Sequence, residues 1–349
     1  MLFRSPLSVP ERGESRGGVP SLAGGEDSTG ISGLPPLRYG EGGGGGEVPF
    51  TKMQAVGNDF VVIEESVWGA DTDWTREAIR LCDRHKGIGG DGLLVVCPSA
   101  VADVRMRMFN PDGTEDMCGN GLRCVVRWAV EHGHFDVHVT EPGHRAGIVE
   151  TLVGERFASA KIEKSGVGEI VTDMGIPVFS PVELPMAIVG LDPVLDYPLA
   201  VEGHGIVTVS TVNTGSTHTV IWVDDLPDDE LFFALSPRIE HHPLFPERTS
   251  VLWARYGTAK RRFEIRIWER GVGETLGCGT GACAVAVLAV QQGKIPRDYY
   301  SVATSSHIKV KSKGGELTVM YITGGRAEPH TALALRGTAH TVFSGTVER

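Results

Sequence analysis

The chain has 349 residues with a formal net charge of -11, and 41% of its residues are hydrophobic. This length suits two domains with substantial cores, while the acidic balance speaks against a nucleic-acid partner. No apolar run reaches the length that spans a membrane, because the longest, residues 282–290, is typical of a buried helix.

Residues 1–47 differ in composition from the rest of the chain. They hold 13 of the 46 glycines and show no apolar periodicity, which predicts a disordered leader. A start codon assigned upstream of the true one would give the same pattern. The leader lacks the apolar core and cleavage site of a secretory signal.

Six cysteines in a large chain without such a signal favour free thiols and a cytoplasmic location. No pair of cysteines or histidines has the spacing of a zinc site. The sequence therefore predicts no metal.

From Val48 onward, short strand-like runs alternate with three helices. Helical spacing predicts helices at 75–85, where Ile79 and Cys82 are expected on one face, at 122–132, and at 281–292, which is apolar nearly all round and expected to lie deep. Alternating or β-branched runs predict strands at 60–64, 93–96, 104–109, 137–140, 146–152, 158–162, 206–212, 219–223, 263–268, 308–310, 317–321, 331–335 and 338–343.

A short internal repeat relates the two halves of the chain. Cys118 and Cys278, 160 residues apart, each begin a Cys-Gly-polar-Gly motif that leads into a second cysteine and an apolar helix. Repeated motifs in register predict two similar domains that face each other across a cleft.

Each motif places a thiol at the start of a helix. The first amide N–H groups of a helix have no partner inside it, and the helix dipole favours negative charge there. Such a site can bind a carboxylate, and it is expected to lower the pKa of the thiol.

Two opposed thiols suit the inversion of a carbon centre. One thiolate removes the α-proton, the other thiol delivers a proton to the opposite face, and two helix N-termini stabilise the carbanion's carboxylate. This chemistry needs no cofactor, pyridoxal phosphate included.

The motifs resemble those of the diaminopimelate epimerase family, from about residue 50 to residue 345. The matching segments are 52–60, 84–92, 109–113, 118–121, 245–249, 269–275 and 278–281. The resemblance implies an α/β (α+β) fold of two pseudo-symmetric domains, each a curved, mainly antiparallel sheet wrapped around a central helix. The domains would be residues 48–170 plus 337–349, and residues 171–336.

The resemblance also implies roles for individual residues. Cys118 and Cys278 would be the acid–base pair, between two amide cradles. The remaining expected roles are as follows: Gly119-Asn120 and Gly279-Thr280 form the cradles, Asn58 contacts the reacting amino group, Asn110 and Arg270 bind the distal carboxylate, Glu269 pairs with the distal ammonium, and Glu269 and His218 tune the acidity of the cysteines.

Two departures from the family pattern concern the binding of the distal carboxylate. Ser216 and Ser250 stand where asparagines that bind the distal carboxylate are usual in the family. The chemistry expected is epimerisation of LL-2,6-diaminopimelate to meso-diaminopimelate, for lysine and peptidoglycan precursors. A two-cysteine racemase for another amino acid is the alternative, and a non-catalytic thiol protein is a third interpretation.

Several of these residues also have plain structural interpretations. Glu269 and Arg270 could form a surface ion pair, His218 could be a neutral core histidine, and Asn58 could be a turn residue. The expected partner is a small amino-acid substrate, with no nucleic acid and no membrane, and a homodimer is left open.

Overall fold

The computed structural model describes residues 46–135, 143–188, 190–295, 306–323 and 331–349. The predicted leader, except for its last two residues, and the strand predicted at 137–140 lie outside these ranges. Within the described part of the chain, no helix is long and apolar enough to cross a membrane.

The N-terminal half is one mixed sheet. Its strands are β1 (Glu47–Ala55), β2 (Asn58–Glu64), β3 (Gly92–Cys97), β4 (Val104–Phe109), the short β5 (Glu115–Asp116), β6 (His144–Thr151), β7 (Gly154–Glu163) and β8 (Gly166–Gly175). Along the sheet the pairs β1/β2, β3/β4, β6/β7 and β7/β8 are antiparallel, while β2/β3 and β4/β6 are parallel.

The C-terminal half repeats this pattern of pairing, with one further strand, β9 (Tyr197–Val201), at its edge. Its other strands are β10 (Gly205–Asn213), β11 (Thr217–Trp222), β12 (Ser250–Gly257), β13 (Arg262–Glu269), β14 (Gly273–Thr275), β15 (Ser306–Lys311), β16 (Glu316–Thr323) and β17 (Thr331–Gly337). Again β11/β12 and β13/β15 are parallel, and the other neighbours are antiparallel. The pseudo-symmetry predicted from the cysteine repeat is thus present in the strand pairing.

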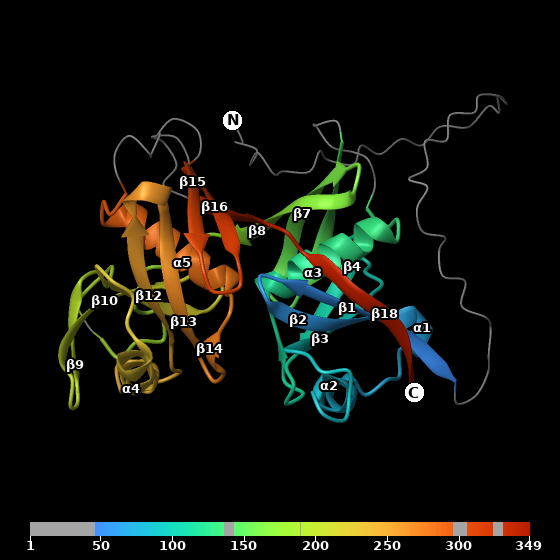
Figure 1. Cartoon of the computed structure of the whole chain (residues 1–349), viewed down its shortest axis with the longest axis horizontal. Coiled ribbons are helices and arrows are strands. Elements are labelled where there is room, and N and C mark those ends of the chain that lie inside the picture. Colours follow the sequence, from blue (N-terminus) through green and yellow to red (C-terminus); the bar gives the residue numbers. More distant parts are fainter. Residues whose placement is uncertain (1–45, 136–142, 189, 296–305, 324–330) are drawn as a thin grey trace.

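Each sheet curves around one long helix. Figure 1 shows α3 (Gly119–Glu131) against the N-terminal sheet and α5 (Gly279–Gln291) against the C-terminal one. Residues 282–289 of α5 are all at most 1% exposed, because the helix is apolar on every side and the sheet surrounds it. Both helices begin at the glycine that follows the first cysteine of the repeat.

Three shorter helices cover the outer faces: α1 (Glu65–Trp68), α2 (Trp74–Cys82) and α4 (Asp229–Glu240). In α2 the buried side chains are Trp74, Ala78, Leu81 and Cys82. The prediction that Ile79 shares the buried face with Cys82 is wrong. Ile79 is 50% exposed, because Cys82 lies at the edge of the buried stripe and Ile79 lies beyond that edge.

Two pairings connect the halves and the chain ends. β8 pairs with β17, which makes the two sheets continuous. β18 (His340–Glu348, red in Figure 1) returns to the N-terminal half and pairs with β1, with Glu47 opposite Glu348. The predicted domain boundary after residue 170 falls inside β8, and the domain limits stay a prediction.

The β1–β2 turn also crosses between the halves. Val56 (φ 48°) and Gly57 (φ 82°) form a two-residue turn between Ala55 and Asn58, which pair with each other. Positive φ at both central positions defines a type I′ hairpin turn, in which a β-branched residue is strained. Val56 nevertheless belongs to the hydrophobic cluster of the C-terminal half, so packing holds it in place.

Three helices and most strands agree with the sequence prediction, with ends displaced by a few residues. The sequence analysis missed the helices α1 and α4, the strands β1, β8, β9 and β12, and the short strands β5 and β14. In α4, Asp228 caps the first turn and Pro237 lies inside the helix, so a good start signal is followed by a residue that normally ends one.

Candidate active site

Cys118 and Cys278 occupy equivalent positions in the two halves. Each is the N-cap residue, after a short strand and before a buried helix, with backbone angles of -133°, 120° and -129°, 118°. Cys118 is partly exposed and Cys278 is 6% exposed. Both thiols are free, so each side chain is positioned by its helix start and not by a disulfide bond.

The two helix starts meet at the junction of the halves. Asn120 Nδ2 donates to the Gly277 carbonyl at 2.8 Å, which joins the first motif to the residue before the second cysteine. A Cβ on Gly279 would lie 3.6 Å from Asn120 Oδ1 and 2.9 Å from Leu335, so only glycine fits without a shift of its neighbours. The structure therefore brings together the two motifs that the sequence repeat singled out.

Arg123 lies behind both cysteines and is fully buried. Its Nη2 donates to Asn120 Oδ1 at 2.5 Å and its Nη1 to the Gly119 carbonyl at 3.4 Å. Burial lowers the pKa of this guanidinium, while the nearby thiols act in the opposite direction. A buried cation at this place favours negative charge on the sulfurs in front of it.

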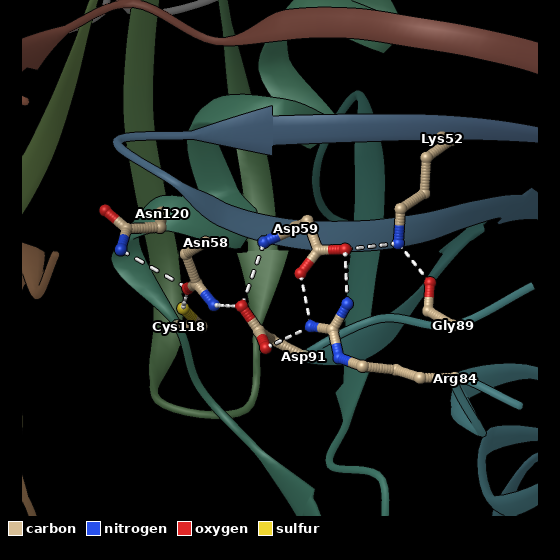
Figure 2. A network of polar contacts seen from close by, with 8 residues as sticks. All are labelled: Lys52, Asn58, Asp59, Arg84, Gly89, Asp91, Cys118 and Asn120. Carbon is tan, nitrogen blue, oxygen red and sulfur yellow. Dashed lines mark hydrogen bonds and ion pairs between the residues drawn. The ribbon is translucent and has the colours of Figure 1, made fainter. Parts of the chain in front are cut away.

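Asn58 lies beside Cys118, at the start of β2. Its Oδ1 is 3.6 Å from Cys118 Sγ and 3.3 Å from Asn120 Nδ2, while its own Nδ2 donates to Asp91 Oδ2 at 2.7 Å. Figure 2 shows the Asn58 amide between Asp91 on one side and Asn120 and the Cys118 sulfur on the other. Asn58 is thus the end of a tight turn, as one interpretation had it, and also a neighbour of the thiol.

An ion network continues from Asp91 away from the thiol (Figure 2). Arg84 Nη2 lies 2.7 Å from Asp59 Oδ1 and 2.7 Å from Asp91 Oδ1, and Lys52 Nζ lies 2.6 Å from Asp59 Oδ2. Burial alone would raise the pKa of Asp59, but hydrogen bonds from Arg84 and Lys52 outweigh it and lower this pKa to about 2. Asp59 is therefore ionised throughout the physiological range.

Cys278 has different neighbours. Its Sγ accepts from the Gly281 N–H at 3.3 Å and lies 3.3 Å from Thr280 Oγ1. Glu269 is close enough to raise the pKa of both active-site thiols through its charge, and Thr275 donates a short hydrogen bond to Glu269 Oε1. Burial in turn raises the pKa of Glu269.

The expected lowering of the thiol pKa values is wrong for these groups as they stand. Burial raises the pKa of Cys118 to about 11 and that of Cys278 well above its usual value, and the Glu269 charge adds to both. Amide N–H groups at the helix starts act in the opposite direction, but desolvation of the charged sulfur outweighs them. The Glu269 charge thus acts to raise the pKa of both thiols, and its expected tuning role stays a prediction.

His218 lies in β11 and is 1% exposed. Burial, helped by the Arg270 charge, lowers its pKa to about 3, so the ring is neutral. Its Nε2 lies 3.1 Å from Ser216 Oγ, and the parallel register places it beside Ser250. His218 has the surroundings of a neutral core histidine, and its expected influence on the cysteines stays a prediction.

The two serines that replace the usual asparagines both have partners within the protein. Ser216 bonds to His218, and Ser250 Oγ accepts from the Arg270 backbone N–H at 3.1 Å. The Arg270 side chain donates to the Glu247 carbonyl at 3.4 Å. The structure thus gathers Ser216, His218, Ser250 and Arg270 at one end of the β11–β12 pair.

Asn110 lies in the turn after β4. Its Nδ2 donates to Thr114 Oγ1 at 3.0 Å, and its backbone N–H to the Thr114 carbonyl at 2.8 Å. These bonds hold the turn together, and a distal-carboxylate role for Asn110 rests on the resemblance alone.

Sequence reasoning missed several supporting residues. Glu240, 2% exposed, accepts from the Trp268 ring N–H at 2.7 Å and the Gly271 backbone N–H at 2.8 Å, so it fixes the loop that carries Arg270. It lies in α4, which the sequence analysis did not predict. Asp91 and Arg84 lie in a segment that matched the family, but no sequence signal linked them to Asn58.

Solved structures of low identity share this two-domain fold. A hydroxyproline epimerase from Agrobacterium vitis has a TM-score of 0.63 at 15% identity, over 86% of this chain and 92% of its own. A phenazine biosynthesis protein of the PhzF family from Bacillus anthracis has a TM-score of 0.59 at 17% identity, over 86% and 99%. The expected fold class is confirmed.

Sequence comparison is more specific. Residues 50–179 and 210–327 match the family model described as diaminopimelate epimerase. A diaminopimelate epimerase from Desulfovibrio desulfuricans is 39% identical over 302 residues, which cover 85% of this chain and 96% of that protein. One from Pelotomaculum thermopropionicum is 38% identical over 303 residues, covering 85% and 97%. The chain belongs to the diaminopimelate epimerase family.

Proposed function

We propose that this protein epimerises LL-2,6-diaminopimelate to meso-diaminopimelate without a cofactor, in the supply of lysine and peptidoglycan precursors. The observation that carries the proposal is the placement of Cys118 and Cys278 as N-caps of two helices that meet at one junction. Family membership supports the substrate.

The mechanism begins with one cysteine as thiolate and the other as thiol. The thiolate takes the Cα proton and becomes a thiol, while the C–H electron pair moves into the substrate carboxylate. Backbone N–H groups of Gly119-Asn120 and Gly279-Thr280 stabilise this enediolate. The opposite thiol then protonates Cα from the other face and becomes the thiolate, so the charge balances.

The high thiol pKa values are consistent with this chemistry. A thiolate whose proton affinity is raised by burial is a stronger base toward a weakly acidic Cα proton. Arg123 behind the sulfurs and the two helix N-termini offset part of the cost of the charge. The helix starts thus act on the substrate carboxylate and on the thiolate together.

For the distal half of the substrate, we propose contacts from Asn110, Arg270 and Glu269, with Ser216 and Ser250 in the places where asparagine is usual. Asn58 would contact the reacting amino group. Ser216 and Ser250 already bond within the protein, so each offers a substrate fewer hydrogen bonds than an asparagine would. A panel of other amino acids tests whether this changes the substrate.

The test is turnover of LL-diaminopimelate in D2O by the purified full chain. We expect deuterium at Cα of the product, and Cys118→Ala and Cys278→Ala should each lower its incorporation by at least about 10²-fold, because each face loses its proton-transfer group. Cys283→Ala, which removes the second cysteine of the repeat in the core of α5, is the matched control and should keep the activity.

The outcomes separate the alternatives. No turnover of LL-diaminopimelate but deuterium exchange with another amino acid would assign the protein as a racemase of different specificity. Full activity in either Cys118→Ala or Cys278→Ala would exclude the two-thiol mechanism. We also propose a cytoplasmic location, supported by six free cysteines, and a homodimer, which sedimentation velocity tests.

A further inference from the structure

The side-chain amide of Asn58 is fixed from both sides. Its Nδ2 faces Asp91 Oδ2 at 2.7 Å, and its Oδ1 faces Asn120 Nδ2 at 3.3 Å and Cys118 Sγ at 3.6 Å. An amide that turned by 180° would place its oxygen against a carboxylate and its NH₂ against the NH₂ of Asn120. Both contacts would lose their hydrogen bonds.

The Asp91 end of this arrangement can only accept. Three donors surround its carboxylate: Asn58 Nδ2, the Asp59 backbone N–H at 3.1 Å, and Arg84 Nη2 at 2.7 Å. Arg84 in turn donates to Asp59, and Asp59 Oδ2 forms an ion pair with Lys52 Nζ at 2.6 Å. Since every neighbour is a donor, a side chain with two acceptor oxygens satisfies the site.

The Asn120 end is equally determined. Arg123 donates to Asn120 Oδ1 at 2.5 Å, and Asn120 Nδ2 donates to the Gly277 carbonyl at 2.8 Å. Because Arg123 has only donors, Asn120 must turn its oxygen toward it and its NH₂ toward Asn58. Both ends therefore impose the same orientation on Asn58.

We propose that Asp91 is a positioning residue that sets the orientation of the Asn58 amide, so that Cys118 faces a hydrogen-bond acceptor and its protonated thiol form is favoured. The contribution of this orientation to epimerisation rests on the proposed function, but the orientation of the Asn58 amide itself does not. In the wild type the thiol donates to Asn58 Oδ1, an interaction that the thiolate cannot make. Asp91 would thereby favour Cys118 as the acid of the pair.

The test measures the pH dependence of iodoacetamide alkylation at each cysteine by peptide mass spectrometry, on the full chain without substrate. Only the thiolate reacts, so the midpoint reports the ionisation of each thiol. Asp91→Asn leaves one acceptor oxygen for three donors, so the hold on Asn58 Nδ2 weakens and the amide turns its NH₂ toward Cys118 in part of the molecules. We expect the Cys118 midpoint to fall by about one pH unit, roughly a tenfold faster reaction at pH 8, with the Cys278 midpoint nearly unchanged.

Asp116→Asn is the matched control. Asp116 lies two residues before Cys118 and bonds the Met117 backbone N–H at 2.7 Å, so the variant removes the same charge near the thiol without touching Asn58. Both variants leave Cys278 unchanged. They also leave unchanged Glu269 and Arg123, the charged groups that act on Cys118 from the facing loop and from α3. An equal shift in Asp116→Asn would mean that charge alone is responsible, and would overturn the proposal.

A double-mutant cycle with Asn58→Ala completes the test. Asn58→Ala alone should also lower the Cys118 midpoint, because the thiol loses its acceptor, so the proposal stays testable even if Asp91→Asn does not fold. In the Asn58→Ala background, Asp91→Asn should shift the midpoint no further. A persisting shift there, or an unchanged midpoint in Asp91→Asn with native circular dichroism, would overturn the proposal, and neither result depends on turnover of any substrate.

Discussion

His218 is a titratable residue whose environment opposes its charge. The ring is 1% exposed, Nε2 faces Ser216, and Nδ1 has no hydrogen-bond partner among the described residues. Burial and the Arg270 charge together lower its pKa from 6.5 to about 3. The unfolded chain therefore binds a proton at a pH where the folded protein does not.

This difference predicts a pH dependence of stability. Below pH 6.5 the unfolded state gains a proton on His218, so the free energy of unfolding falls as the pH falls toward about 3 and is fully regained above 6.5. Between pH 7.5 and 5.5 the loss from this residue should be roughly 1 kcal/mol. Urea unfolding at both pH values measures it.

His218→Gln should remove that part of the pH dependence, whatever its effect at pH 7.5. His340→Gln, at an exposed position of β18, is the matched control and should keep the wild-type difference between the two pH values. The same pH dependence in His218→Gln as in the wild type would show that other groups cause it.

Some features of the candidate site could be predicted from the sequence, and others could not. The pairing of Cys118 with Cys278 could be predicted because both motifs repeat in register. The direction of their pKa shifts could not, because it depends on how far burial outweighs the helix N-terminus. The link from Asp91 to Asn58 joins residues 33 positions apart through a side-chain bond, which no local pattern encodes.

Among the structural elements, the β1–β2 turn shows most clearly how the halves depend on each other. Val56 packs against Gly277 and Gly315 of the other half, and a Cβ on Gly314 would lie 1.7 Å from the Val56 carbonyl oxygen. Gly314 also donates to the Leu276 carbonyl at 2.6 Å. The turn that ends at Asn58 therefore packs against backbone of the other half that lies within two residues of Cys278.

Gly314→Ala is expected to be destabilising by more than about 2 kcal/mol, because the new methyl group meets rigid backbone and not a flexible side chain. It should also lower epimerase activity, since the displaced turn carries Asn58. Gly257→Ala, where the nearest atom to the new Cβ would be 3.5 Å away, is the matched control. Equal unfolding midpoints in urea for the two variants would contradict this account.

Element types were more predictable than their extents. α3 and α5 follow from apolar periodicity after a glycine-rich start, whereas α4 contains a proline and β12 begins directly after a turn, where Arg248 has a φ of 62°. Tertiary packing decides such segments, and local propensity does not. The repeat predicted two similar domains, but the exchange of strands between them depends on contacts far apart in sequence.

At the scale of the whole molecule, the β8–β17 pair makes one continuous sheet from two curved halves. Cys118 and Cys278 lie where the helix starts of these halves meet, so the relative position of the halves sets the distance between the two thiols. β18 completes the N-terminal sheet from the far end of the chain, at the position that β9 takes in the C-terminal sheet.

The Glu47–Glu348 pairing at the sheet edge has a consequence for how the chain can be reconnected. Because these ends are neighbours, a short Gly-Ser linker could join Arg349 to Gly46, and new termini could be opened at the exposed β7–β8 turn, between Lys164 and Ser165. Such a circular permutant should fold and keep its activity, whereas one opened between Leu94 and Val95 in the buried β3 should not. In the first permutant the linker would join β18 to β1 as an ordinary hairpin, while β8 would begin the chain, ahead of the C-terminal half, without any change in the site.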